Sequence, residues 1–223
     1  METEIGKNIL RFRELVPENV DIVAVSKFHP ASMILSAYEA GQRLFGESRV
    51  QEFLQKEEEL PKDIKWHFIG HLQTNKVKSI IGKTSLIESV DSERLLELIN
   101  KESEKAGVVS EVLLQVHVAA EEAKFGFYPE ELSAYIASAQ WRTLKNVRIR
   151  GLMGMATNTD DEKRVRNDFK ALRDLYKAIK EQRLEGLEYF DSLSMGMSGD
   201  WALAVEEGST IVRIGSAIFG ERV

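Results

Sequence analysis

The sequence predicts an α/β fold: a single closed (β/α)₈ barrel, or TIM barrel, with an additional helix before the first strand. Short apolar runs rich in β-branched residues, typical of buried parallel strands, alternate with longer segments of helical periodicity. Eight such units in 223 residues suit a closed barrel better than an open doubly wound sheet, which is the alternative because periodicity does not show closure. No linker or composition break divides the chain, so we expect one domain over residues 1–223.

The eight predicted strands alternate strictly with helical segments, an order that favours parallel strands joined by helical crossovers. Their expected ranges are Ile22–Ser26, Arg43–Gly46, Trp66–Ile69, Leu86–Val90, Glu111–Val118, Arg148–Met155, Tyr189–Ser194 and Thr210–Ile214.

The predicted helices have recognisable ends. Gly41, Pro61 and Gly107 each end a helix. Asp91 is a candidate cap for the helix that follows it, and Pro129 suits a first helical position. The expected ranges are Glu4–Glu14, Ser32–Ala40, Val50–Leu60, Ser92–Ala106, Glu130–Gln140 and Asp161–Arg183.

The composition argues against several classes of function. A net charge of −6 gives no support for nucleic-acid binding, which requires a basic surface. The absence of cysteine excludes disulfides, thiolate metal sites and a cysteine nucleophile, and it suits a reducing cytoplasm. No segment approaches the roughly 20 apolar residues of a membrane span, and residues 1–15 lack the apolar run of a signal peptide. We therefore expect a cytoplasmic protein that binds neither nucleic acid nor membranes.

Lys27 follows the first predicted strand directly. Binding and catalytic residues of this fold lie at the C-terminal ends of the strands. A lysine there that loses hydration has a lowered pKa and becomes a competent amine nucleophile. The alternative is a strand-end lysine that reaches into solvent, and the position of Lys27 alone favours that alternative.

The loops after the last two strands favour a phosphate site. Strand 7 runs into Ser194–Asp200, which contains two glycines and two serines. Strand 8 runs into Gly215 and Ser216 at the start of a short helix. Small residues allow a phosphate to approach backbone N–H groups, and these two loops are the usual phosphate site of the fold. The alternative, that glycine and serine only make tight loops, is less favoured when both loops are taken together.

The four histidines are interpreted as hydrogen-bonded structural residues rather than metal ligands. No acidic residue stands near any of them at a metal-ligand spacing such as H-E-x-x-H. They are His29, His67, His71 and His117.

Segments spread in order over almost the whole chain resemble the pyridoxal phosphate homeostasis protein family. These are single-domain proteins related to the N-terminal barrel of alanine racemase. The strongest matches are Leu193–Ser198 and Val212–Gly220. The other matching segments are Val23–Lys27, Phe45–Glu47, Trp66–Lys76 and Arg150–Met153.

This resemblance implies a cofactor and the residues that hold it. Lys27 is expected to bind pyridoxal 5′-phosphate (PLP) as a Schiff base. Ser198, Gly215 and Ser216 are expected to hold the phosphate, with Ser194 lining the same loop.

Two further residues bear on the chemistry. The resemblance implies that Arg213 donates to the nitrogen of the pyridine ring. Because a guanidinium stays charged, such a contact disfavours protonation of that nitrogen and argues against transamination. Ser48 departs from the family, which commonly has asparagine after Phe-Gly-Glu, and it is given no role.

The resemblance implies a non-catalytic carrier that stores and buffers PLP inside the cell and delivers it to apo-enzymes. The alternative is a PLP-dependent amino-acid racemase. Racemisation by two bases needs a proton donor on the face opposite the lysine, and in alanine racemases a tyrosine from a second domain supplies it. We expect no second domain here, and Tyr128 is the tyrosine nearest to the predicted mouth. The carrier is therefore favoured, and a monomer is expected because the racemase dimer relies on that second domain.

Overall fold

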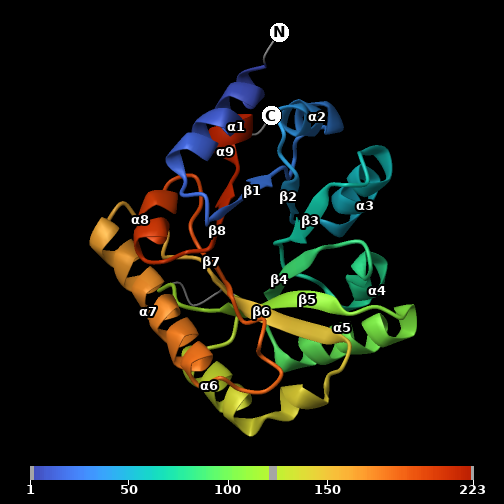
Figure 1. Cartoon of the computed structure of the whole chain (residues 1–223), viewed down its shortest axis with the longest axis vertical. Helices are drawn as coiled ribbons and strands as arrows, with labels where there is room; N and C mark the ends of the chain where they lie inside the picture. The colour runs from blue at the N-terminus through green and yellow to red at the C-terminus, as the bar shows by residue number, and fades with distance from the viewer. Residues whose placement is uncertain (1–2, 121–124, 222–223) are drawn as a thin grey trace.

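The computed structural model describes residues 3–120 and 125–221. Eight parallel strands are hydrogen-bonded in chain order, and β1 also pairs with β8, so the sheet is closed. The predicted barrel is confirmed, and the open sheet is excluded. Figure 1 shows the helices arranged around the outside of the strands.

The strands lie close to their predicted ranges, with one exception. Strand β7 begins at Ser192 rather than Tyr189, because the preceding segment forms a turn in which Phe190 N–H donates to Leu187 O. The strands are β1 (Asp21–Val25), β2 (Leu44–Glu47), β3 (Lys65–Phe68), β4 (Leu86–Val90), β5 (Ser110–Val116), β6 (Val147–Gly154), β7 (Ser192–Ser194) and β8 (Ile211–Ile214).

The helices also agree with the sequence, with two corrections. The cap of α5 is Ser92 rather than Asp91, since the Ser92 hydroxyl accepts the Leu95 N–H. A short helical segment, η1 (Thr74–Lys76) with α4, was not predicted, because it is too short to show a helical period. The α-helices are α1 (Glu4–Leu15), α2 (Ala31–Glu39), α3 (Val50–Glu59), α4 (Val77–Ile80), α5 (Glu93–Ala106), α6 (Pro129–Ser138), α7 (Glu162–Glu181), α8 (Trp201–Glu206) and α9 (Ser216–Phe219).

Two helix ends follow their sequence signals closely. Pro129 is the first residue of α6, where its missing N–H leaves no helical bond unmade. Gly107 adopts a left-handed conformation with φ of 68° at the end of α5, as a C-terminal glycine permits.

The inside of the barrel changes from apolar to polar along the strand direction. Its lower layer is a compact cluster of Val23, Leu86, Leu113, Met153 and Ile211. Because side chains two residues apart share a face of a strand, the next inward positions toward the C-terminal ends are those two residues later. In β4, β5 and β8 these are buried polar residues, namely Glu88, Gln115 and Arg213.

The N-terminal helix α1 packs beside the C-terminal helix α9. Figure 1 shows α1 next to α9, and Asn8 Nδ2 donates to Ile218 O at 3.0 Å between these two helices. None of the helices formed by the described residues has the length and apolar character needed to cross a membrane.

Candidate functional site

A cavity of about 260 Å³ lies at the C-terminal ends of the strands. Its apolar wall is formed by Val25, Ile69, Met155 and Met197, and its polar residues come from the ends of β1, β2, β7 and β8. The described residues that complete the lining are Lys27, His29, Ser48, Ser198, Gly199, Arg213, Gly215, Ser216 and Gly220. Five of the six residues predicted to bind the cofactor therefore meet at one cavity.

Lys27 occupies the corner of a tight turn that begins where β1 ends. The turn is closed by the His29 N–H, which donates to Ser26 O at 3.1 Å. Phe28 has a φ of 69°, a conformation that costs a residue with a side chain of order 1–2 kcal/mol. The turn places Lys27 on the cavity lining, half-buried, where an amine can meet a bound molecule.

The loops after β7 and β8 supply donors for an anion. Ser198 Oγ accepts hydrogen bonds from Gly215 N–H at 3.1 Å and from Ala217 N–H at 3.4 Å. Ser216 lies between these two residues and is exposed at the cavity. Converging backbone N–H groups and a serine hydroxyl suit phosphate oxygens, so the structure brings together Ser198, Gly215 and Ser216 as the sequence predicted.

Arg213 forms the floor of the cavity from inside the barrel. It is buried, and its guanidinium donates to Ser194 Oγ and, at 3.0 Å, to Gly154 O. Glu88 Oε2 lies 3.6 Å from the guanidinium and supplies the opposite charge. Burial lowers the pKa of Arg213, and the charge of Glu88 opposes that effect.

Glu88 is fully buried and is held by three partners. Its Oε1 lies 2.6 Å from His67 Nδ1, and its Oε2 accepts the Ser194 hydroxyl at 2.6 Å. Burial by itself raises the pKa of a carboxyl group, but the hydrogen bond and charge of His67 and the charge of Arg213 outweigh burial, so the pKa of Glu88 lies below its ordinary value. The ionised carboxylate only accepts, and His67 Nδ1 is therefore the donor.

Ser194 differs from its predicted place. It is fully buried at the end of β7, and its hydroxyl lies between Glu88 and Arg213 inside the barrel. It is absent from the described residues that line the cavity. Because β7 points this side chain inward, Ser194 orients Arg213 rather than facing a phosphate.

Sequence reasoning did not single out Glu88 or assign His67 a partner. A usable signal was present in each strand, since a charged or polar residue interrupts an otherwise apolar run. A buried carboxylate in such a run requires partners on neighbouring strands, and these are visible only once the barrel is closed.

The other histidines make contacts that do not converge on one point. His71 Nδ1 lies 2.9 Å from Asp91, His29 stacks on Phe219, and His117 packs edge-on against a tyrosine ring. The described residues contain no group of three side chains arranged to hold a metal ion.

Ser48, the residue that departs from the pattern of the resembled family, lies on the cavity lining. The chain beside it packs closely on Gly70, where an added Cβ would lie only 2.2 Å from Ser48 O. This approach fixes the main chain of Ser48 against the end of β3.

The lining as a whole fits PLP. A flat aromatic ring suits the apolar wall, and a phosphate suits the donors around Ser198. An aldehyde suits the amine of Lys27, and a ring nitrogen suits the guanidinium of Arg213.

Comparison with protein families gives a match over nearly the whole chain. Residues 2–223 match the family described as "Alanine racemase, N-terminal domain". The pyridoxal phosphate homeostasis protein of Aquifex aeolicus is 43% identical over 202 residues, which cover 90% of this chain and 86% of that protein. The protein of the same name from Schizosaccharomyces pombe is 41% identical, covering 92% of this chain and 85% of its own length.

Solved structures give the same result. PipY of Synechococcus elongatus without PLP has a TM-score of 0.90 and 37% identity, and the match covers 97% of this chain and 100% of PipY. The PipY structure with PLP bound has a TM-score of 0.87 at the same identity and coverage. Alanine racemase from Streptomyces coelicolor shares the fold, with a TM-score of 0.77 at 17% identity, and this chain covers 58% of it.

Proposed function

Because the chain belongs to the pyridoxal phosphate homeostasis protein family, within the wider family of the alanine racemase N-terminal domain, we propose that it binds PLP covalently through Lys27 and acts as a carrier. The carrier stores and buffers the reactive aldehyde and delivers it to apo-enzymes. The observation that supports this is the convergence of an amine, an arginine and an anion site on one cavity, in a chain that is 37% identical to a protein solved with PLP bound.

Each lining residue has a defined part in this proposal. When bound, the cofactor supplies an aldehyde that condenses with an amine, with loss of one water as a Schiff base forms. Lys27 supplies that amine. Ser198, Gly215 and Ser216 hold the phosphate, and Arg213 donates to the ring nitrogen.

Arg213 also favours carriage over catalysis. Glu88 and Ser194 hold its guanidinium in place, and the charge of Glu88 favours the cationic form. A fixed cation beside the ring nitrogen opposes protonation of that nitrogen, which weakens the ring as an electron sink. The described residues that line the cavity include no tyrosine, so a two-base racemase lacks its second acid among them. Tyr128 instead packs against His117.

Covalent attachment is tested by an absorption spectrum before and after borohydride reduction, followed by mass mapping of the modified lysine. We expect the modification at Lys27 in the wild type and the loss of the imine absorption band in Lys27→Ala. Lys65→Ala is the matched control, because Lys65 is an exposed lysine at the opposite end of a barrel strand. Reduction that modifies a different lysine, or an unchanged band in Lys27→Ala, would contradict the proposal.

Carriage is tested separately by incubating the PLP-loaded protein with L-amino acids in deuterium oxide. We expect neither Cα exchange nor formation of the D-isomer at turnover rates of order 1 s⁻¹. Either result at such rates would favour the racemase. A monomeric state and a cytoplasmic location are part of the same proposal, and sedimentation of the purified protein tests the first of these.

A further inference from the structure

The turn that carries Lys27 is held on both sides by one charge cluster, formed by the buried residues Glu47 and Lys56 and the partly buried Glu52. Glu47 ends β2, and the other two residues lie on α3. The cluster lies behind the strands, between the barrel and the helix, and its residues are not among those that line the cavity. None of them was assigned a role from the sequence: Glu47 only ended the matching segment Phe45–Glu47, and the run Lys56–Leu60 is typical of a solvated helix end. That interpretation is wrong for Lys56, which is buried.

The residue before Lys27 is held by two members of this cluster. Lys56 Nζ donates to Ser26 O at 2.8 Å, and the Ser26 hydroxyl donates to Glu47 Oε1 at 2.6 Å. The residue after Lys27 is held by the third member, because Glu52 Oε1 accepts the Phe28 N–H. The peptide groups on both sides of Lys27 are therefore fixed by the same cluster.

Lys56 joins the cluster into one unit. Besides Ser26 O, its ammonium group donates to Glu47 Oε1 and to Glu52 Oε1, each at 2.7 Å. Three acceptors match the three donors of an ammonium group. The side chain of Lys56 is 7% exposed and that of Glu47 is 0% exposed, so solvent does not substitute for the bond between them, while Glu52 is partly buried.

The backbone of the turn shows why such a restraint is needed. Phe28 stands in the turn position with positive φ, where glycine is usual, yet it carries a large side chain that is partly exposed. A conformation of this kind persists only where the surroundings determine it. The bond from Phe28 N–H to Glu52 and the guanidinium of Arg49, 4.4 Å from the centre of the Phe28 ring, provide that restraint.

A buried charge cluster contributes little net stability, because removing its charges from water costs free energy. Well-packed apolar residues of similar volume are often as stabilising as a buried ion pair or more so. Glu47 Oε2, moreover, is the one buried side-chain oxygen or nitrogen in the described chain that has no hydrogen-bond partner. Among the described residues, the side-chain hydrogen bonds found from the cluster to its surroundings go to the two residues that flank Lys27.

We propose that Glu47, Glu52 and Lys56 are positioning residues that hold the amine of Lys27 at the cavity for condensation with an aldehyde. The inference rests on the proposed function. In the condensation, the nitrogen of Lys27 bonds to the aldehyde carbon, and the aldehyde oxygen leaves with the two amine protons as water. The cluster touches none of these atoms and acts by fixing the turn.

The test separates covalent attachment from occupation of the cavity. Imine formation by the cofactor-stripped full chain is followed by absorption after PLP is added. Binding of pyridoxine 5′-phosphate, which carries an alcohol in place of the aldehyde and forms no imine, is measured by calorimetry. We expect Glu52→Ala to slow imine formation about tenfold or more, since small displacements of a reacting group have effects of this size. Binding of the alcohol is expected to stay within about twofold of wild type, a ratio too small to indicate a lost hydrogen bond.

Conservative and charge-balanced variants complete the set. Glu52→Gln keeps an oxygen that can accept from Phe28 N–H and Lys56, so it is expected to form the imine at close to the wild-type rate. The double variant Lys56→Met with Glu47→Gln removes one charge of each sign and the bond to Ser26 O, and we expect it to be slow. Lys83→Met is the control, because Lys83 lies outside α3 and forms a partly exposed ion pair with Glu57, which is on α3 like Glu52 and Lys56.

The outcomes distinguish this inference from the proposed function. Wild-type rates in Glu52→Ala and in the double variant would overturn the positioning role while leaving the function intact. A parallel loss of alcohol binding would overturn it as well, since the cluster would then only support the cavity. A wild-type protein that forms no adduct at Lys27 would overturn both.

Discussion

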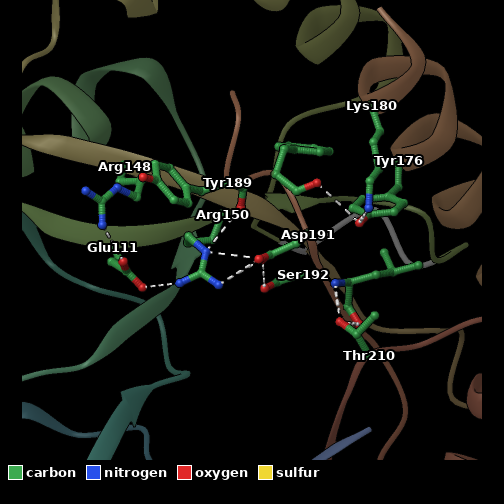
Figure 2. A network of polar contacts seen from close by, with 11 residues as sticks. Glu111, Arg148, Arg150, Tyr176, Lys180, Tyr189, Asp191, Ser192 and Thr210 are labelled. Atoms are coloured by element: carbon green, nitrogen blue, oxygen red, sulfur yellow. Dashed lines mark hydrogen bonds and ion pairs between the residues drawn. The ribbon is translucent and has the colours of Figure 1, made fainter. Parts of the chain in front are cut away.

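The two ends of the barrel each carry an arginine beside a carboxylate, in opposite surroundings. At the C-terminal end, Arg213 and Glu88 are buried, with 4% and 0% of their side chains exposed. At the N-terminal end, Arg150 lies between Glu111 and Asp191, and 52% of the Asp191 side chain is exposed (Figure 2). Burial lowers the pKa of Arg213. For Arg150, burial is outweighed by the hydrogen bond to Asp191 and the charge of Glu111, and the pKa is raised.

The N-terminal cluster joins neighbouring strands near the solvent. Arg150 donates to both oxygens of Asp191, at 2.9 and 3.0 Å, and Glu111 also accepts from Arg148 at 2.9 Å. The guanidinium of Arg148 lies over the ring of Tyr189, 4.5 Å from its centre. These contacts link the beginnings of β5, β6 and β7, as Figure 2 shows, and exposed pairs of this kind each contribute about 0.2–1 kcal/mol.

The difference between the Arg213 pair and the Arg150 cluster indicates that the barrel is less stable than it could be where it forms the candidate site. An apolar layer like the one below it would fill the barrel above Met153 at lower cost than a buried carboxylate and guanidinium. The polar layer instead lies directly under the cavity, where Arg213 can face a ligand. The exposed cluster has no such neighbour, and we assign it to stability alone.

The largest expected effect is that of Glu88→Ala. The substitution leaves the guanidinium of Arg213 buried without its opposite charge, so the free energy of unfolding is expected to fall by about 3–5 kcal/mol. Urea denaturation monitored by circular dichroism measures the change.

The double variant Glu88→Ala with Arg213→Met is the control for this prediction. It removes both charges and is expected to recover part of the lost stability, while PLP binding stays impaired. A loss below 1 kcal/mol in Glu88→Ala would mean that the buried pair behaves like the exposed one, and the comparison would fail.

A second, smaller effect is expected in the pH dependence of two buried glutamates. The pKa of Glu88 is lowered, so its contribution to stability is present above the ordinary value of 4.5 and is lost as the pH falls through the folded-state pKa. Burial raises the pKa of Glu47 against the opposing effects of Lys56 and Ser26. Its contribution is therefore present below 4.5 and is lost as the pH rises through the folded-state pKa.

The measurement is the free energy of unfolding of wild type, Glu88→Gln and Glu47→Gln between about pH 2 and pH 7. Glu88 differs from an unfolded chain below the ordinary value of 4.5, and Glu47 differs from it above that value. The advantage of wild type over Glu88→Gln is expected to grow as the pH rises. The difference between wild type and Glu47→Gln is expected to move the other way. If both differences changed with pH in the same direction, the lowered pKa of Glu88 or the raised pKa of Glu47 would be wrong.

Much of the fold could be predicted because it depends on local signals. Alternating apolar runs and helical periods identified eight strands and most helices, and Pro129 marked the beginning of α6. The β7 boundary and α4 were missed for physical reasons. A three-residue strand and a four-residue helix are too short to show a period, and the Leu187–Phe190 turn imitates a strand in composition.

The site could be predicted in part. The loops after the last two strands indicated a phosphate site with Gly215 and Ser216, and the family resemblance implied Lys27 and Ser198. The barrel places the ends of β1, β7 and β8 together, and these four residues line one cavity. The inward orientation of Ser194 depends on the strand register, which the sequence does not display. The Glu88 and Lys56 clusters join residues far apart in the chain, and their bonds depend on barrel closure and helix packing.

The smallest expected effect is that of Asp191→Asn at the N-terminal end. Arg150 keeps Glu111, and the amide oxygen of asparagine can still accept, so the free energy of unfolding is expected to fall by about 0.2–1 kcal/mol. Because half of the Asp191 side chain is exposed, the loss is expected to shrink further at high salt. PLP affinity and the absorption spectrum of the loaded protein are expected to match those of wild type. Urea denaturation at low and high salt, with a PLP titration of the same sample, measures all three. A change in PLP affinity would show that the two ends of the barrel are coupled, and the assignment of the N-terminal cluster to stability alone would be wrong.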